Sequence, residues 1–453
     1  MSHSLKTHLD EIVYLKSIKS LLSWDQETQM PMEGAPFRAD QCALIECLIQ
    51  DRILDSKIVD FIQQTSHDPE TRRQQVLLKD DFEKHSLPKD LVERIAKHSV
   101  ASVESWRVAR EEKDFSMFQK DLRIMVKLNQ EVADILKKGK SRYDALLSFY
   151  DRDLTYQAID LLFNPLEKKL TEIIKEKKYP NRNSIPIPAP IEAQKKICEK
   201  VVQLIAPGSL LKESTHPFCD MLGPKDVRLT TRYNPQDLFE ALYSTLHELG
   251  HALYDQQLPH HKPYPLNQAL SLTVHESQSK LFETCIGGST EFLEFLHPLF
   301  KEHIPEFKLS LKELIDSRHA ISPNPIRIDS DIEVSDLPEV FRGYQKNLLG
   351  LDVTNDSEGC LQDIHWAAGY FGYFPTYLTG CMFAADQYAR MNEGIHISSN
   401  LQRGDVEAVR KWLKDHIHGY GSSLPLQELL RASTKKELSS ERYFAYLQTR
   451  FLS

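Results

Sequence analysis

The spacing of apolar residues predicts that this chain is built from amphipathic helices. Leucine and isoleucine recur every three or four positions through residues 5–22, as one face of an α-helix requires, and residues 122–135 repeat the pattern. The pattern returns at residue 191 and again from residue 236 to the C-terminus, with turns marked by proline and glycine. The sequence contains neither βαβ alternation nor an internal repeat. An all-α architecture is therefore predicted.

Composition and charge narrow the class of protein. Only 17 of the 453 residues are glycine and no Asn-Gly or Asp-Gly pair occurs, so the common hairpin signals are missing. No apolar run is long enough to cross a membrane, and charged residues interrupt the N-terminal segment where a signal peptide needs an apolar stretch. Acidic residues outnumber basic ones, 65 to 56, which argues against nucleic acid or an anionic membrane as a partner. The seven cysteines are scattered without a CxxC pair, which favours reduced thiols and a cytoplasmic protein.

The strongest chemical signal is the segment His-Glu-Leu-Gly-His that begins at residue 247. His247 and His251 are four positions apart, so both imidazoles leave the same face of a helix about one turn apart. This HExxH pattern binds zinc through its two histidines and uses the glutamate, here Glu248, as general base. We expect Asn234, which a proline follows, to cap this helix.

A catalytic zinc needs a third protein ligand and an open position for water. A third histidine on the same segment is excluded, because Tyr254 and Gln257 occupy the positions that need glycine and histidine. A glutamate from a following antiparallel helix is the alternative, and Glu276 lies 25 residues after His251 within the helical pattern 274–283. The weaker candidates for the third ligand are Glu283, His275, His260 and His261.

Further short segments, in a fixed order, extend this signal over nearly the whole chain. They are residues 23–26, 216–218, 226–233, 275–278, 326–331, 359–366 and 372–377. With HExxH, they make the chain resemble the carboxypeptidase Taq family of metallocarboxypeptidases. The resemblance implies an all-helical protein with a deep active-site cleft, here between two helical lobes. It also implies a homodimer that removes single residues from peptides with a free C-terminus.

The resemblance also assigns the metal chemistry. His247, His251 and Glu276 would bind the metal, which agrees with the third ligand favoured by spacing, and Glu248 would be the general base. Zinc is the metal that two histidines and a glutamate favour, while cobalt or manganese accept the same ligands.

The remaining catalytic roles follow from the resemblance residue by residue. His216, with Tyr373 or Tyr377, would donate hydrogen bonds to the developing oxyanion. Arg327 would hold the free carboxylate of the peptide with its guanidinium fork, and Arg228 is the second candidate. Structural roles are the alternatives: an ion pair with neighbouring aspartates for Arg327, core packing for the tyrosines, and a loop hydrogen bond for His216.

The segment after Asp331 departs from the family. Family members continue there into a helix of roughly two dozen residues, about six turns, before a segment like residues 334–339. Here that segment follows almost at once, so a helix beside Arg327 is missing. Its loss would widen the cleft or displace Arg327. The alternatives to a carboxypeptidase are therefore a metal-binding homologue with impaired catalysis and a metallopeptidase of another cleavage mode.

The domain organisation follows from the spread of these residues. Length alone allows up to three domains, and the Pro-rich stretch 179–190 is the best candidate for a boundary. Because the expected site draws on residues 216–377, we instead predict a single peptidase domain over residues 1–453. The Pro-rich stretch would then connect two lobes.

Overall fold

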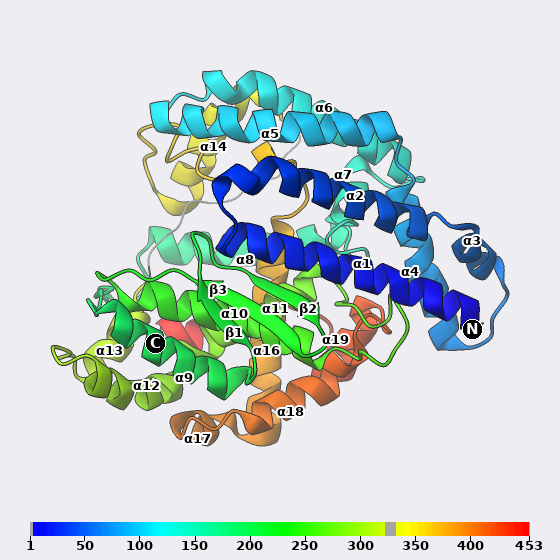
Figure 1. Cartoon of the computed structure of the whole chain (residues 1–453). Helices are drawn as coiled ribbons and strands as arrows, with labels where there is room; N and C mark the ends of the chain where they lie inside the picture. Colours follow the sequence, from blue (N-terminus) through cyan, green and yellow to red (C-terminus); the bar gives the residue numbers. More distant parts are fainter. Residues whose placement is uncertain (1–2, 322–331, 453) are drawn as a thin grey trace. The chain divides into compact units, whose positions relative to one another are not determined.

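The structure, a computed structural model, describes residues 3–321 and 332–452 and is helical apart from one small sheet (Figure 1). The predominantly helical fold predicted from sequence is confirmed. The chain divides into two compact units, and one change of unit falls at residues 181–182, inside the Pro-rich stretch. The single domain and the cleft between lobes stay predictions. The first unit is Met1–His85, Arg182–His319 and Gly380–Leu438; the second is Ser86–Asn181, Ala320–Thr379 and Ser439–Ser453.

The first unit opens with four helices whose apolar faces pack together. They are α1 (His3–Thr28), α2 (Ala35–Ile53), α3 (Ser56–Gln63) and α4 (Pro69–His85), with a 3₁₀ turn at Met32–Gly34. The apolar stripe expected on α1 is buried in its first half, at Leu5, Leu9 and Ile12, and these residues share a core cluster with Ile53. Further along the same stripe, Ile18 is 44% exposed, so the buried face ends midway.

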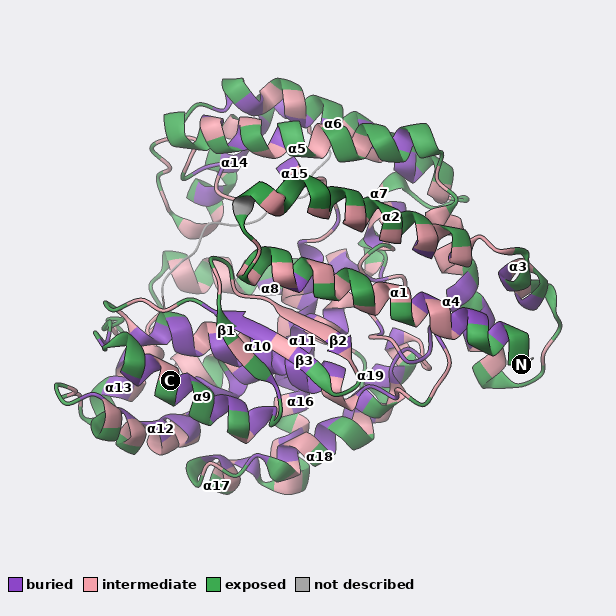
Figure 2. Ribbon diagram, in the orientation of Figure 1, coloured by how far each residue is buried: buried purple, intermediate pink, exposed green. Residues whose placement is uncertain are grey.

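The other helices of the first unit include α10 (Leu238–Gln257), which Figure 2 shows as mostly buried. The leucines of α10 lie on one face, and other buried residues such as Phe239, His251 and Tyr254 occupy the remaining sides, so the helix is enclosed by the unit. The others are α9 (Ile191–Ile205), α11 (Leu272–Lys280), α12 (Thr290–His303), α13 (Leu311–Arg318), α16 (Pro375–Ile395, from Gly380 on), α17 (Ile397–Gln402), α18 (Glu407–His416) and α19 (Leu426–Thr434). A π-helical turn at Leu281–Ile286 follows α11, and a 3₁₀ turn at His418–Tyr420 follows α18.

A three-stranded sheet packs on α10, and the sequence analysis did not anticipate it. The strands are β1 (Leu210–Glu213), β2 (Cys219–Gly223) and β3 (Asp226–Thr231), in the order β1-β3-β2. β1 runs parallel to β3, and β2 runs antiparallel to it. The Thr231 hydroxyl donates to the Ala241 carbonyl at 3.1 Å, which fastens β3 to α10. Strands this short carry too little alternation to be found in sequence.

The second unit is held together by the pair α5 (Lys89–Glu112) and α6 (Ser116–Leu136). The stripe expected on α6 is buried at Met125, Leu128 and Val132, while Ile135 is 45% exposed. The other elements are α7 (Arg142–Leu147), α8 (Tyr156–Lys175), α14 (Leu337–Tyr344), α15 (His365–Ala368), α20 (Ser440–Leu447), a 3₁₀ turn at Val334–Asp336 and π-helical turns at Gln345–Leu349 and Gln448–Leu452. None of the helices within residues 3–321 and 332–452 is long and apolar enough to span a membrane.

Candidate metal centre

The helix that carries the HExxH segment begins three residues later than expected. Its N-cap is Asp237, whose carboxylate accepts a hydrogen bond from the Phe239 amide at 3.1 Å. The expectation that Asn234 caps the helix is wrong, because its side chain accepts from the Gln236 amide at 2.9 Å and stabilises the turn before the helix. The position of the histidines on α10 is unaffected.

The structure brings together the three residues expected to bind the metal. One nitrogen each of His247 and His251 and one oxygen of Glu276 all lie within 4.8 Å of one another. His247 Nε2 is 3.9 Å from Glu276 Oε2, and Glu276 is buried on α11. In the part of the chain that the structure describes, no other group of three histidine, cysteine or carboxylate ligands meets this criterion.

Two glycines allow neighbouring helices to approach this group closely. A Cβ atom at Gly250 on α10 would lie 2.2 Å from the carbonyl oxygen of Gln278 on α11. A Cβ atom at Gly380 on α16 would lie 2.9 Å from the Cβ atom of Glu276. Side chains at either position would push the helix of Glu276 away from its neighbours. Nothing in the sequence marked Gly380 for this role.

Polar partners fix the orientation of two of the three candidate ligands. His247 Nδ1 is 2.8 Å from Glu283 Oε2, which also accepts a hydrogen bond from Lys280 Nζ at 2.7 Å. The π-helical turn after α11 carries Glu283, and such turns are frequent at functional sites. Ser279 Oγ donates to Glu276 Oε2 at 2.9 Å. Glu283, one of the weaker candidates for the third ligand, therefore contacts a ligand histidine.

The third candidate ligand has an imidazole as its partner. His251 Nδ1 and His275 Nδ1 are 2.5 Å apart, and His275 Nε2 is 3.3 Å from Asp255 Oδ1. His275 was another weak candidate for the third ligand, and its contact is again with a ligand histidine. Metal-binding histidines regularly have a hydrogen-bond partner on their second ring nitrogen. Two histidines and a glutamate, each held in this way, fit a hydrolytic zinc ion.

Burial sets the charge states around the group. Burial raises the pKa of Glu248 to about 7, and the nearby Glu276 carboxylate contributes in the same direction. Burial also holds the pKa of His251 well below its ordinary value, so this imidazole is neutral, as metal binding requires. At His247, burial lowers the pKa, but the hydrogen bond to Glu283 and the negative charges of Glu283 and Glu248 together outweigh burial, so the pKa is raised.

The two first-unit residues proposed to contact substrate have other contacts. His216 is exposed in the loop between β1 and β2, and its carbonyl accepts a hydrogen bond from Ser214 Oγ at 2.6 Å. The Arg228 guanidinium makes two hydrogen bonds of 2.8 Å to Asp226 and lies over the Trp24 ring at 5.7 Å. These contacts support a structural role for Arg228, and the catalytic role of His216 stays a prediction.

The other expected site residues belong to the second unit or lie outside the described residues. Tyr373 and Tyr377 are 5.3 Å apart by ring centroid and surround His365, whose Nε2 is 3.4 Å from the Tyr377 hydroxyl. The other nitrogen of His365 pairs with Asp363. Arg327 lies outside the described residues. The roles of the tyrosines and of Arg327 stay predictions.

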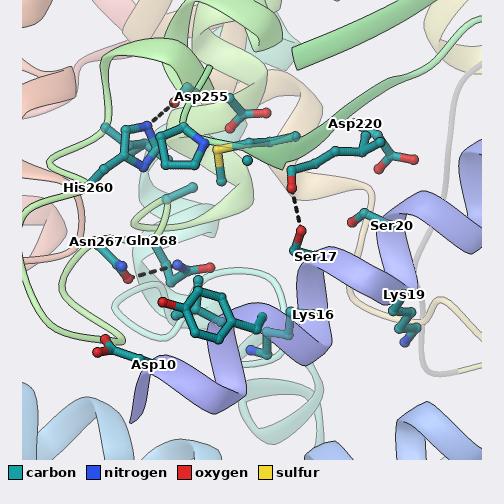
Figure 3. Close-up of a pocket in the computed structure, with 18 of the residues that line it drawn as sticks. Asp10, Lys16, Ser17, Lys19, Ser20, Asp220, Asp255, His260, Asn267 and Gln268 are labelled. Atoms are coloured by element: carbon teal, nitrogen blue, oxygen red, sulfur yellow. Dashed lines mark hydrogen bonds between the residues drawn. The ribbon is translucent and has the colours of Figure 1, made fainter. Parts of the chain in front are cut away.

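A cavity of about 1280 Å³ in the first unit (Figure 3) extends to His275, which contacts the candidate ligand His251. It lies between α1, β2 and the loop after α10, and its lining includes Asp255 and His275. Ser17 of α1 donates to the carbonyl oxygen of Leu222 on β2, which closes one side. The half-buried Asp220 also lines it, and burial followed by the charge of Asp255 raises its pKa to about 6. Sequence reasoning missed this cavity because its walls come from segments far apart in the chain.

Comparison with known proteins gives similarity over almost the full length. "Thermostable carboxypeptidase 1" of Pyrococcus furiosus is 28% identical, over 96% of this chain and 95% of that protein. "Carboxypeptidase 1" of Bacillus subtilis is 28% identical, over 98% of this chain and 96% of that protein. Among solved structures, a Pyrococcus furiosus carboxypeptidase superposes with a TM-score of 0.94 at 27% identity, covering 100% of this chain and 99% of that one.

The family comparison places the chain directly. The description "Carboxypeptidase Taq (M32) metallopeptidase" matches residues 4–333 and 330–451. The match consists of two segments that overlap at residues 330–333, where the sequence analysis expects a missing helix. With the His-His-Glu group in place, the chain belongs to the carboxypeptidase Taq (M32) family of metallopeptidases and is a metallocarboxypeptidase, a hydrolase of peptide bonds.

Proposed function

We propose that this metallocarboxypeptidase binds zinc through His247, His251 and Glu276 and hydrolyses the last peptide bond of peptides with a free C-terminus. The observation that carries the proposal is the convergence of these three ligands beside the buried Glu248. When bound, zinc supplies Lewis-acid chemistry: it polarises a carbonyl group and makes water more acidic. Cobalt fits the same ligands.

Glu248 handles the proton in this proposal. With a pKa of about 7, its carboxylate accepts the proton of the attacking water and then gives it to the leaving amine. A carboxyl with an ordinary pKa would be too weak a base for the first step and too weakly protonated for the second. Burial of Glu248, at 7% exposure, also keeps competing water away from the transferred proton.

Substrate recognition rests on the resemblance. Arg327 binds the terminal carboxylate in this proposal, and the ion pair already made by Arg228 leaves it the weaker choice. His216 together with Tyr373 or Tyr377 donates to the oxyanion. Peptides with a free C-terminus and broad side-chain specificity are the substrates.

A homodimer in the cytoplasm completes the proposal. The dimer rests on the resemblance to the family. The compartment is supported by the seven cysteines, none of which is paired in a disulfide in the described structure, as expected where reducing conditions prevail.

The test is incubation of the zinc-loaded protein with one peptide in two forms, a free acid and a C-terminal amide. Mass spectrometry should show stepwise loss of C-terminal residues from the free acid alone, and no product with Glu248→Gln. Equal cleavage of the amide would contradict the carboxypeptidase specificity and favour another cleavage mode.

A metal-binding homologue with impaired catalysis is the second candidate. It is favoured by the division of the family match into two segments that meet at residues 330–333, close to Arg327. If the protein binds zinc with ordinary affinity but yields no product from free-acid peptides, this candidate replaces the first.

A further inference from the structure

The second ring nitrogen of the candidate ligand His251 is not exposed to water but faces another imidazole. The Nδ1 atoms of His251 and His275 lie 2.5 Å apart, and their ring centroids are 4.3 Å apart. The Tyr254 ring packs on His275 at 5.4 Å, and the Asp255 carboxylate lies 3.3 Å from His275 Nε2. Three side chains are thus connected in a row from His251 to Asp255.

Elementary hydrogen-bond chemistry fixes the direction of this row. A carboxylate only accepts hydrogen bonds, so when His275 is neutral its proton must be on Nε2, facing Asp255. His275 Nδ1 is then bare and accepts, so the proton of His251 must be on Nδ1. A neutral His251 protonated on Nδ1 has its lone pair on Nε2, which is the atom left to bind a metal ion.

We propose that Asp255 and His275 are positioning residues that hold His251 in the tautomer and orientation that bind the metal. The proposal rests on the ligand assignment in the proposed function. Asp255 lies one turn after His251 on α10, and His275 directly precedes Glu276 on α11. The two helices that carry the ligands therefore also carry Asp255 and His275. The packing of α10 against α11 brings these two side chains and the ligands together.

The carboxylate of Asp255 is suited to this role because it is 8% exposed and held in place. A nearby pocket histidine, His260, contacts the backbone carbonyl of Asp255 at 3.0 Å rather than its carboxylate (Figure 3). The carboxylate of Asp255 therefore faces His275. His260 can serve as a control histidine, because it contacts only the backbone of Asp255.

The test measures the affinity of the metal-free protein for Zn²⁺ alone, by competition with a chelator of known affinity. Asp255→Asn offers His275 an amide that can donate as well as accept, so the selection of the tautomer is lost. His275→Phe keeps a ring in place but removes both nitrogens. We expect each to weaken zinc binding by about 10- to 100-fold. Asp255→Glu retains a carboxylate and should recover most of the affinity.

Two control variants come from the same cavity. Asp220→Asn removes a pocket carboxylate and His260→Phe removes a pocket imidazole, and among the described residues neither side chain forms a hydrogen bond, ion pair or ring contact with His251 or His275. Both should bind zinc within twofold of the unaltered protein. Thermal unfolding of each metal-free variant identifies any that fails to fold.

A spectroscopic signature separates positioning from packing. In zinc-loaded protein labelled with ¹⁵N-histidine, His251 should show a protonated Nδ1 and a metal-bound Nε2, and Asp255→Asn should lose the protected Nδ1 proton. The proposal is overturned if folded Asp255→Asn binds zinc within twofold of the unaltered protein, or if Asp255→Glu loses as much affinity as Asp255→Asn. Zinc affinity is measured without peptide, so a failure of peptide hydrolysis leaves this result intact.

Discussion

Replacing Gly250 by alanine tests how closely α10 and α11 must approach to form the metal centre. The new Cβ atom would lie 2.2 Å from the Gln278 carbonyl oxygen, whereas real Cβ atoms keep at least 3.0 Å from such atoms. The two backbones must therefore separate by about 0.8 Å. His251 follows Gly250 on one helix and Glu276 lies on the other. Because ligand distances in metal sites are held to within about 0.2 Å, this separation exceeds the tolerance about fourfold.

We expect Gly250→Ala to weaken zinc binding by at least about tenfold and to lower the free energy of unfolding by about 1–3 kcal/mol, as overpacked cores do. Chelator competition and urea unfolding measure the two effects. Gly394→Ala is the matched control, because Gly394 is exposed near the end of α16 with nothing within 4 Å of its added Cβ atom. If Gly250→Ala matches the unaltered protein in both measurements, the close approach of the helices is not what holds the ligands.

Three further predictions concern charge and proton transfer. Glu248→Gln should lower kcat/KM on free-acid peptides by about 10²- to 10⁴-fold, because the proton acceptor is lost while the metal ligands remain. Glu283→Gln should weaken zinc binding by about 10- to 100-fold, because His247 loses a charged partner. Burial lowers the pKa of His418 to about 3 from 6.5, so below pH 6.5 the unfolded chain takes up a proton that the folded chain does not. The free energy of unfolding should therefore decrease as the pH is lowered below 6.5, and this histidine should account for a loss of about 2 kcal/mol at pH 5.

Each of these predictions has a control and a contrary outcome. Unchanged zinc affinity in Glu248→Gln separates lost proton transfer from a lost metal, and full activity would show that another group takes the proton. Glu302→Gln, an exposed glutamate, is the control for Glu283→Gln; equal affinities in the two variants would show that Glu283 is dispensable. For His418, urea unfolding of His418→Gln across pH 5–8 should lose part of the slope, and identical slopes would contradict the argument.

The sequence determined those features that depend on residues close together in the chain. The helical fold follows from a period of three to four in the apolar residues, as the buried faces of α1 and α6 show. The pairing of His247 with His251 follows from a spacing of one helical turn. Glu276 could be predicted as the third ligand because the helical pattern placed it on a following helix that would run antiparallel to the helix of the histidines.

Only the tertiary structure decided what lies across from these residues. The late start of α10 reflects the hydrogen bonds that the side chains of Asn234 and Asp237 accept. Glu283 and His275 looked like ligands in sequence and became partners of ligands, because the approach of α11 to α10 at Gly250 sets which side chains meet. A one-dimensional pattern fixes the face of a helix, but the distance between two helices depends on the shapes packed between them.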